Sequence, residues 1–381
     1  MPMKKNIGYS LEEIYKLIYN NPGITKPELA DLLGVSLPAI SENVNRLLDR
    51  GYIRIHKKGV SRGGRRPYLY EINPTYKYIL GADIRKHYFY LFVSDLYGAP
   101  IDDIVIPVES PDFKSYVSVM KKEIDLLLRR NSLKRGDILS FSVSITGTTD
   151  IENKKVLRSL QLGWEDVPFS HKFEEILGIP VFIENDARIY AYNELESDDE
   201  KNVAVILFLG EGLGISFIIN NKLFKGYTNK AGDNRFFGDR LGVLMDITRK
   251  NDILRKINEL PYYFEKFQPD KIKGLNNDFE KYISEDIERF IDEFSHLAIL
   301  LINIVDPKKL VLTGNIFDFN DYIYKGVRDR IKGCDSIYHV PQIKRSHYGD
   351  RPLERGIVKM VMSKVFELHL FKFNQKSGGV L

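Results

Sequence analysis

The chain has 381 residues, 43% of them hydrophobic and 28% charged, and its formal net charge is +4 at pH 7. That length suffices for two or three domains with ordinary cores, and the composition is typical of a globular protein. We expect neither a secretion signal at its start nor a membrane partner, because no apolar run approaches the roughly 20 residues that cross a bilayer. A single cysteine, Cys334, excludes an internal disulfide and a site of several thiolates, which favours the cytoplasm.

Positive charge is concentrated between Tyr52 and Pro67. This stretch contains no acidic residue and the following lysines and arginines: Arg54, Lys57, Lys58, Arg62, Arg65 and Arg66. A local excess of this kind favours a polyanionic partner, although a solvated loop can have the same composition.

Three short helices are predicted in the first 50 residues. Apolar side chains at helical spacing between Leu11 and Ile18 indicate the first helix. Thr25 and Glu28 form the pattern of a capping box at the start of the second helix. Ser36 is placed to cap the third helix, and Gly51 ends it where a left-handed residue is needed.

The next residues predict a wing. Residues 52–55 and 68–72 have the pattern of two strands, joined by the basic loop from His56 to Pro67. Three helices followed by this hairpin predict a winged helix-turn-helix domain at residues 1–72, with double-stranded DNA as its partner. A three-helix packing unit without DNA contact is the alternative.

In a winged helix the start of the third helix enters the major groove. Ser41 and Asn45 can hydrogen-bond to base edges or phosphates, while Leu37 and Pro38 can contact thymine methyl groups. Arg46 lies further along and is expected to neutralise phosphate. The predicted DNA-binding residues are Ser36, Leu37, Pro38, Ser41, Asn45, Arg46, Arg62, Arg65 and Arg66.

Residues 61–67 of the wing read Ser-Arg-Gly-Gly-Arg-Arg-Pro. Glycines between arginines let an extended backbone enter a narrow minor groove, and narrow minor grooves belong to A·T-rich tracts. We therefore expect a preference for A·T-rich flanks. Contact with phosphate alone is the alternative.

The rest of the chain predicts an α/β architecture. After a linker at residues 73–77, strands and helices occur in two successive sets, which indicates two lobes at residues 78–186 and 187–352. The second set includes a long apolar helix at residues 283–305. A closing helix at residues 353–370 is expected to pack back on the first lobe.

Several segments resemble the ROK family of repressors and sugar kinases. These are residues 163–168, residues 177–187 with the run Glu184-Asn185-Asp186-Ala187, residues 209–214 and residues 311–315. The Glu-Asn-Asp-Ala run is fairly specific, whereas each glycine-rich loop alone is weak. The resemblance, to regulators of the xylose-repressor or N-acetylglucosamine-repressor type, implies a winged helix-turn-helix followed by a two-lobed actin-like ATPase (ROK sugar kinase) fold.

The phosphate-binding loops of the family's kinases are altered here. Where those kinases have D-x-G-G-T, this chain has Asp83-Ile84-Arg85-Lys86-His87, whose bulky side chains oppose a close approach of backbone to phosphate. The second loop, usually G-T-G, is Gly210-Glu211-Gly212, and its carboxylate would repel a γ-phosphate. We expect no ATP binding and no phosphoryl transfer, although Arg85 and Lys86 can still attract an anion.

The family's zinc segment is altered as well. Its kinases have G-E-x-G-H followed by a cysteine cluster, whereas this chain has Gly232-Asp233-Asn234-Arg235-Phe236 and no cysteine before Cys334. Phenylalanine stands in the place of the histidine ligand. The resemblance therefore predicts no zinc and no other cofactor in this chain.

The resemblance also implies a sugar site. Asp186 aligns with the catalytic base, and a carboxylate suits equally well as an acceptor for two sugar hydroxyls. Trp164 or Phe236 can pack on the apolar face of a pyranose. The predicted sugar-binding residues are Thr146, Gly147, Trp164, Asn185, Asp186 and Asp233. Each of them alone is also typical of a turn or a helix cap.

Together these features predict a sugar-responsive transcriptional regulator, by resemblance a repressor of carbohydrate-utilisation genes, whose kinase-like domain senses a sugar without catalysis. It is expected to bind two half-sites as a homodimer or higher homo-oligomer. One alternative is an active glucose or N-acetylhexosamine kinase with an added DNA-binding domain. It is favoured by Asp83, Asp186 and Gly314 and opposed by Arg85, Glu211 and Phe236. Another is a regulator whose C-terminal part only holds subunits together.

Overall fold

The structure is a computed structural model. It describes residues 10–59, 66–110, 112–150, 154–195, 202–209, 212–232, 238–259, 284–319, 321–346, 351–368 and 371. Residue contacts group the chain into two compact units. The first unit comprises residues 1–78, 95–99 and 361–381, and the second comprises residues 79–94 and 100–360.

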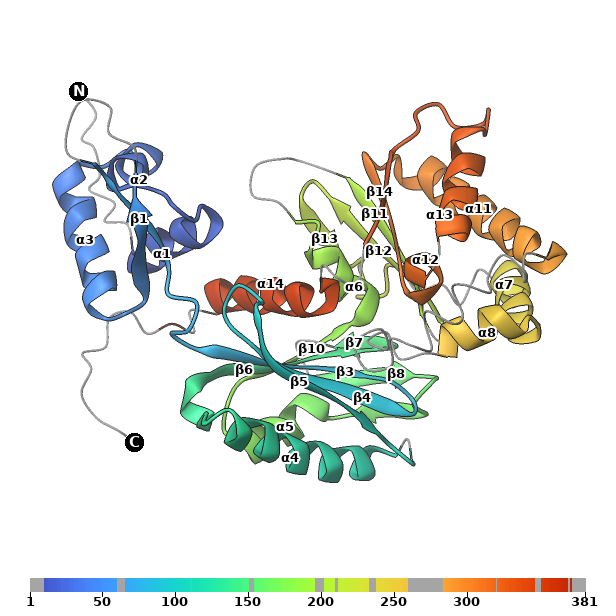
Figure 1. Cartoon of the computed structure of the whole chain (residues 1–381), viewed down its shortest axis with the longest axis horizontal. Coiled ribbons are helices and arrows are strands. Elements are labelled where there is room, and N and C mark those ends of the chain that lie inside the picture. Colours follow the sequence, from blue (N-terminus) through green and yellow to red (C-terminus); the bar gives the residue numbers. More distant parts are fainter. Residues whose placement is uncertain are drawn as a thin grey trace. The chain divides into compact units, whose positions relative to one another are not determined.

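The described part of the first unit has three helices followed by a two-stranded antiparallel sheet, as predicted for a winged helix-turn-helix (Figure 1). The elements are α1 (Leu11–Asn20), α2 (Lys26–Leu33), α3 (Leu37–Asp49), β1 (Ile53–Lys58) and β2 (Tyr68–Ile72). The capping box of α2 is confirmed, because Glu28 N–H donates to Thr25 Oγ1 and Thr25 N–H donates to Glu28 Oε2. Gly51 has a φ of +74°, as the predicted helix end requires.

One local prediction is wrong. Ser36 precedes α3, but its side chain makes no capping hydrogen bond. Pro38 occupies the second position of the helix and has no N–H, so one of the two donors that a capping side chain normally receives is missing.

Aromatic side chains from distant parts of the sequence meet in the first unit. Tyr15 of α1 is fully buried, and its ring centroid lies 5.1 Å from that of Phe371 and 6.1 Å from that of Phe366. Tyr19 stacks on Tyr97 with centroids 5.9 Å apart. The turn at residues 95–99 and the C-terminal segment therefore contribute to the core of the winged-helix unit.

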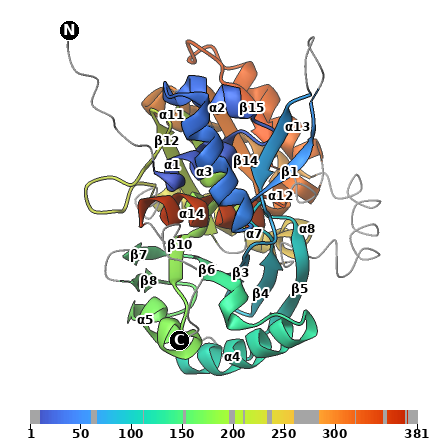
Figure 2. The same ribbon diagram turned by 90° about the vertical axis from the view of Figure 1, so that its left-hand side faces the viewer.

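The first sheet of the second unit has the strand order β10-β6-β3-β4-β5. Its strands are β3 (Tyr78–Ile84), β4 (Tyr88–Ser94), β5 (Pro100–Pro107), β6 (Ile138–Ile145) and β10 (Val181–Asn185). The strands β3, β4 and β5 are antiparallel neighbours, whereas β10 runs parallel to β6. The helices α4 (Phe113–Arg130) and α5 (Phe169–Leu177) cover one face of this sheet (Figures 1 and 2).

A small antiparallel sheet follows β6. Its short strands are β7 (Thr148–Asp150), β8 (Lys155–Ser159) and β9 (Trp164–Val167). The sequence did not predict this sheet, because strands of three to five residues are too short for an alternating pattern to stand out.

The second sheet of this unit has the order β13-β12-β11-β14-β15. Its strands are β11 (Val203–Leu209), β12 (Gly212–Ile219), β13 (Lys222–Phe224), β14 (Lys309–Thr313) and β15 (Gln342–Arg345). The accompanying helices are α6 (Asp186–Tyr192), α7 (Gly238–Lys250), α8 (Asp252–Glu259), α11 (Glu285–Val305), α12 (Asn315–Phe319) and α13 (Asp321–Lys332). The long helix predicted at residues 283–305 is α11.

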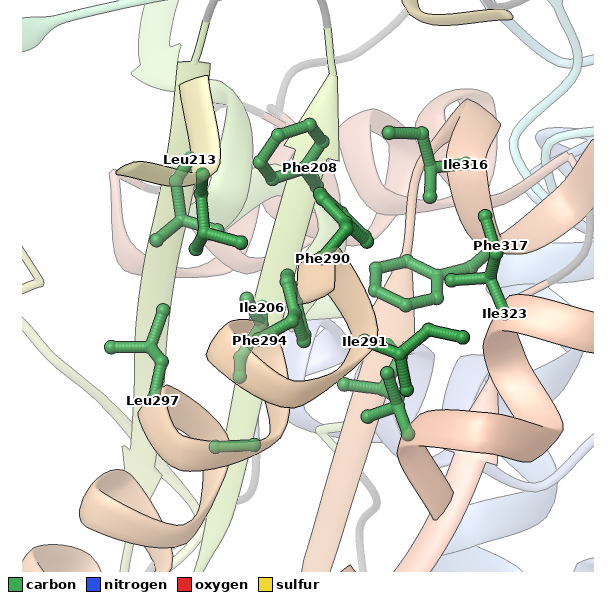
Figure 3. Close-up of a cluster of buried hydrophobic side chains, with 14 of the residues drawn as sticks. Ile206, Phe208, Leu213, Phe290, Ile291, Phe294, Leu297, Ile316, Phe317 and Ile323 are labelled. Carbon is green, nitrogen blue, oxygen red and sulfur yellow. The ribbon is translucent and has the colours of Figure 1, made fainter. Parts of the chain in front are cut away.

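The second sheet and α11 share an aromatic core (Figure 3). The ring of Phe208 on β11 lies 5.4 Å from that of Phe290, and Phe294 lies 4.8 Å from Phe317, both pairs edge to face. All four rings are fully buried. This core holds β11 and β12 behind the cavity described below.

The closing helix α14 spans Pro352–Glu367. Its residues up to Met360 belong to the second unit, and those from Val361 onward belong to the first. None of the helices in the described ranges is both long enough and apolar enough to cross a membrane.

Candidate DNA-binding helix and ligand cavity

The helix α3 presents the predicted contact residues on its outer face. Ser36, Leu37, Pro38, Asn45 and Arg46 are exposed, and Ser41 is half-buried. The opposite face packs into the core with Ile40, Val44 and Leu47. Leu37 is 46% exposed, so its apolar side chain is accessible to a partner.

Two of these residues already have neighbours. Lys26 Nζ donates to Asn45 Oδ1 at 2.9 Å, which leaves the Asn45 amide nitrogen to act as a donor. Arg46 pairs with Glu42 at 2.6 Å, but both side chains are exposed, so phosphate can replace the carboxylate at little cost. Lys26 lies over the Tyr70 ring, and burial lowers its pKa. Sequence reasoning missed Lys26, because its role depends on how α2 packs beside α3.

The wing is described only in part. Arg66 is exposed, whereas Arg62 and Arg65 fall outside the described residues. Arg54 of β1 is held at Nε, which donates to the buried carboxylate of Glu71 at 2.6 Å.

The second unit contains a cavity of about 270 Å³. It is lined by Thr146, Gly147, Thr148, Arg158, Ser159, Leu160, Gln161, Asn185, Asp186, Arg188, Leu207, Gly212, Leu213, Gly214, Ile215, Asn229, Lys230, Ala231 and Gly232. Four predicted sugar-binding residues, Thr146, Gly147, Asn185 and Asp186, are therefore brought together in one cavity. Asp233 and Phe236 lie beyond the residues that the structure describes.

Two glycines allow the cavity walls to approach each other. A Cβ on Gly147 would lie 2.3 Å from the carbonyl oxygen of Arg158, and Gly147 has a φ of +118°. A Cβ on Gly232 would lie 1.9 Å from the carbonyl oxygen of Ile215. Neither position can accept a side chain without a backbone shift.

Asn185 acts as a helix cap. Its Oδ1 accepts from the Arg188 N–H at 3.3 Å, and its Nδ2 donates to the Gly147 carbonyl at 2.9 Å. These bonds join the start of α6 to the turn after β6. Asn185 thus positions the backbone around the cavity, as the capping interpretation of this residue predicts.

Asp186 forms a buried ion-pair network with two residues of the β3–β4 segment. Arg85 Nε and one terminal nitrogen donate to the two oxygens of Asp83 at 2.8 and 3.1 Å, and its other terminal nitrogen donates to Asp186 Oδ2 at 2.8 Å. Arg85 is 6% exposed, Asp83 1% and Asp186 6%. The expectation that Arg85 attracts an external anion is therefore wrong, because its guanidinium is already committed to two carboxylates.

The same network changes the chemistry of Asp186. Burial raises the pKa of this carboxyl, and the adjacent Arg85 opposes the rise. Its other oxygen, Oδ1, accepts from the Ala187 N–H at 2.8 Å. Asp186 can still accept hydroxyl hydrogen bonds through its remaining lone pairs, but taking up a proton as a base would weaken its bond to Arg85.

Arg188 organises the opposite wall, and sequence reasoning missed it. It is 4% exposed, and it donates to Asn229 Oδ1 at 3.0 Å and to the Asn229 carbonyl at 2.7 Å. It also lies 3.4 Å from Glu184, four residues earlier, at the end of β10. The four-residue spacing of Glu184 and Arg188 is a sequence pattern that could have indicated an ion pair.

Trp164 does not line the cavity, so the predicted stacking on a sugar ring is wrong for this residue. It is 4% exposed, and its ring packs edge to face against Phe113 and Tyr116, each with centroids 5.3 Å away. An indole is large enough to fill the gap between β9 and α4, where it gains more apolar contact than at a cavity edge.

Comparison with known proteins agrees with this architecture. The model of the ROK family matches residues 83–234, and a winged helix-turn-helix DNA-binding model matches residues 10–54. This chain is 23% identical to a xylose repressor of Caldicellulosiruptor bescii over 376 residues, which cover 92% of this chain and 94% of that protein.

Two further proteins are similar to this chain. A xylose repressor of Bacillus spizizenii is 28% identical over 222 residues, 58% of each chain. The solved structure of a ROK family transcriptional regulator, described as a homolog of E. coli MLC protein, superposes with a TM-score of 0.67 at 16% identity and covers 94% of this chain and 97% of that one. The latter likeness shows the shared fold.

Residues 233–236, where the altered zinc segment lies, fall outside the described residues. Within the described ranges, no group of three or more His, Cys, Asp or Glu side chains can hold a metal ion. Cys334 is half-buried, and its Sγ lies 3.0 Å from Ser336 Oγ rather than near the cavity lining.

Proposed function

We propose that this chain is a ROK family member that acts in the cytoplasm as a sugar-responsive, DNA-binding transcriptional repressor of carbohydrate-utilisation genes. The observation that carries the proposal is the pairing, in one chain, of a winged helix with an exposed α3 face and a separate unit with a cavity that Asp186 and Asn185 help to line. The names of the repressor relatives support it and make xylose the first sugar to test.

We also propose that the chain does not phosphorylate its sugar and uses neither ATP nor zinc. Arg85 supports this part, because a base that is bound to a buried guanidinium is poorly placed to take a proton from a hydroxyl. Gly314 had favoured the kinase alternative. Its φ is +111°, and a Cβ there would lie 2.0 Å from the Phe208 carbonyl oxygen, so close backbone packing is a sufficient reason for glycine.

The cavity suggests how a sugar would act. Its lining comes from the turn after β6 and the start of α6 on one side, and from β12 of the second sheet on the other. A ligand with hydroxyls around a ring would contact both sides and favour the closed arrangement of the two sheets. In a homodimer, such a change would alter the spacing of two winged helices on two operator half-sites.

Fluorescence anisotropy tests this function. The purified protein is titrated into DNA from upstream of its own transcription unit at fixed salt, with and without xylose and other mono- and disaccharides. We expect specific binding that one sugar releases. Specific binding that no sugar alters would favour the scaffold alternative, and absence of specific binding would overturn the proposal. ATP-dependent phosphorylation of any of these sugars would establish the kinase alternative.

A further inference from the structure

The network around Arg85 joins segments that are far apart in the chain. Asp83 lies on β3, Asp186 begins α6, and the bond between Arg85 and Asp186 spans 101 residues. All three side chains are nine-tenths or more buried. Asp83 and Asp186 accept hydrogen bonds from different nitrogens of the guanidinium, so a single cation bridges the two acids.

The charges show why a cation is needed there. Two carboxylates that approach one another out of water repel strongly, and such a pair normally holds a proton or a metal ion between its members. The Arg85 backbone keeps the guanidinium in place, because its N–H donates to the Tyr88 carbonyl at 3.0 Å and its carbonyl accepts from the Tyr116 hydroxyl. The cation is therefore part of the fold.

The choice of arginine also fits the geometry. The planar fork of Arg85 donates two hydrogen bonds to Asp83 and a third to Asp186. A lysine ammonium is a point charge on a flexible stem and lacks this fixed fork. The resemblance to sugar kinases leads one to expect a magnesium nucleotide near these aspartates, and the residues present do not fit that expectation.

We propose that Arg85 is a tethered cation that replaces a divalent metal ion between Asp83 and Asp186, so that this cavity binds its ligand without Mg²⁺ and without nucleotide. The cation replacement stands on the geometry of the three side chains alone. The consequence for a sugar effector rests on the proposed function. Because the cavity then needs no nucleotide, the response of the repressor to its sugar does not depend on the supply of ATP in the cell.

Mn²⁺ binding tests the replacement directly, with electron paramagnetic resonance for bound metal and thermal unfolding for its effect on the folded state. The wild-type protein is expected to bind no Mn²⁺ at this place. Arg85→Ala exposes two buried carboxylates to each other, and carboxylate oxygens are the ligands that Mn²⁺ and Mg²⁺ prefer. We expect the variant to bind one Mn²⁺ and to gain unfolding temperature on binding. Adding Asp186→Asn should abolish both effects.

Arg330 provides a matched control. It also lies between two carboxylates, with one terminal nitrogen 2.5 Å from Glu288 and Nε bonded to Asp292, but all three side chains are at least one-third exposed. Arg330→Ala leaves two solvated acids, which are expected to bind Mn²⁺ much more weakly. If Mn²⁺ raised the unfolding temperature of Arg330→Ala as much as that of Arg85→Ala, burial of the carboxylates would not matter for metal binding. That result would count against the proposal.

The remaining outcomes are also decisive. A folded Arg85→Ala that binds no Mn²⁺ would overturn the proposal, as would wild-type binding that Asp186→Asn removes. Should Arg85→Ala fail to fold, Arg85→Gln retains hydrogen-bond donors without the charge. Folding of either variant only in the presence of Mn²⁺ supports the replacement, and failure to fold even with Mn²⁺ refutes it. Because sugar and DNA take no part, these results leave the test of the repressor function separate.

Discussion

Phe371 offers a test of whether the C-terminal segment is part of the winged-helix unit. It is 7% exposed, and its ring lies 5.1 Å from Tyr15, 5.9 Å from Tyr52 and 6.3 Å from Tyr76. Phe371→Ala removes an aromatic ring that contacts the first helix, the start of the wing and the linker region. We expect the free energy of unfolding of this unit to fall.

The size of the loss follows from burial. Replacing a buried phenylalanine by alanine costs about 3–5 kcal/mol, and the loss of aromatic pair geometry is included in that range. Phe371 is 7% exposed rather than fully buried, so we expect the lower limit of about 3 kcal/mol. For a unit of this size each kilocalorie corresponds to roughly 4–8 °C in unfolding temperature.

Near-ultraviolet circular dichroism of the tyrosines during heating measures this loss, and operator binding at increasing temperature measures its consequence. Leu368→Ala is the matched control, because Leu368 lies three residues earlier and is 52% exposed. Leu368→Ala should leave the free energy of unfolding within about 0.5 kcal/mol of the wild-type value. Identical unfolding of the two variants would refute the assignment of the C-terminal segment to the winged-helix core.

Four further changes have defined outcomes. Burial raises the pKa of Glu354, so the folded state holds this proton more tightly than the unfolded state. Stability is then full below the ordinary carboxyl pKa and falls as pH rises through the raised value, and Glu354→Gln should flatten this slope in denaturant titrations at several pH values. Arg66→Ala should weaken operator binding and reduce the salt slope of log K by about 1 in anisotropy titrations. Gly314→Ala should destabilise the second unit in urea unfolding, because its Cβ would lie 2.0 Å from the Phe208 carbonyl oxygen. Trp164→Ala should cost about 3–5 kcal/mol in the same assay yet leave sugar affinity unchanged in the folded protein.

Opposite results would be equally informative. An unaltered pH slope in Glu354→Gln would mean that another group controls it. A salt slope unchanged by Arg66→Ala would remove Arg66 from phosphate contact. Wild-type stability of Gly314→Ala would restore Gly314 as a residue that favours the kinase alternative. A loss of sugar affinity in folded Trp164→Ala would return the indole to the binding site.

Local features of this protein were determined by the sequence alone. The capping box of Thr25 and Glu28, the helical spacing in α1 and α3 and the hairpin of the wing depend on residues within a few positions of one another. The strand at residues 138–145 follows from alternation of apolar residues with serines, and the long helix α11 follows from apolar residues at helical spacing. Thr146, Gly147, Asn185 and Asp186 were found as a set because their segments keep the family's order.

The roles of individual side chains were decided only by the tertiary structure. Arg85 lies in a basic segment, and its sequence context suggested that it could attract an anion. In the structure it forms an ion pair with Asp186, which is distant in the sequence. Trp164 stands in a motif of the sugar site, yet α4 supplies a better apolar environment. Phe371 follows the last helix, yet it completes a core that begins at Tyr15. Burial and charge pairing act through space between residues far apart in the chain, so no local pattern could have predicted them.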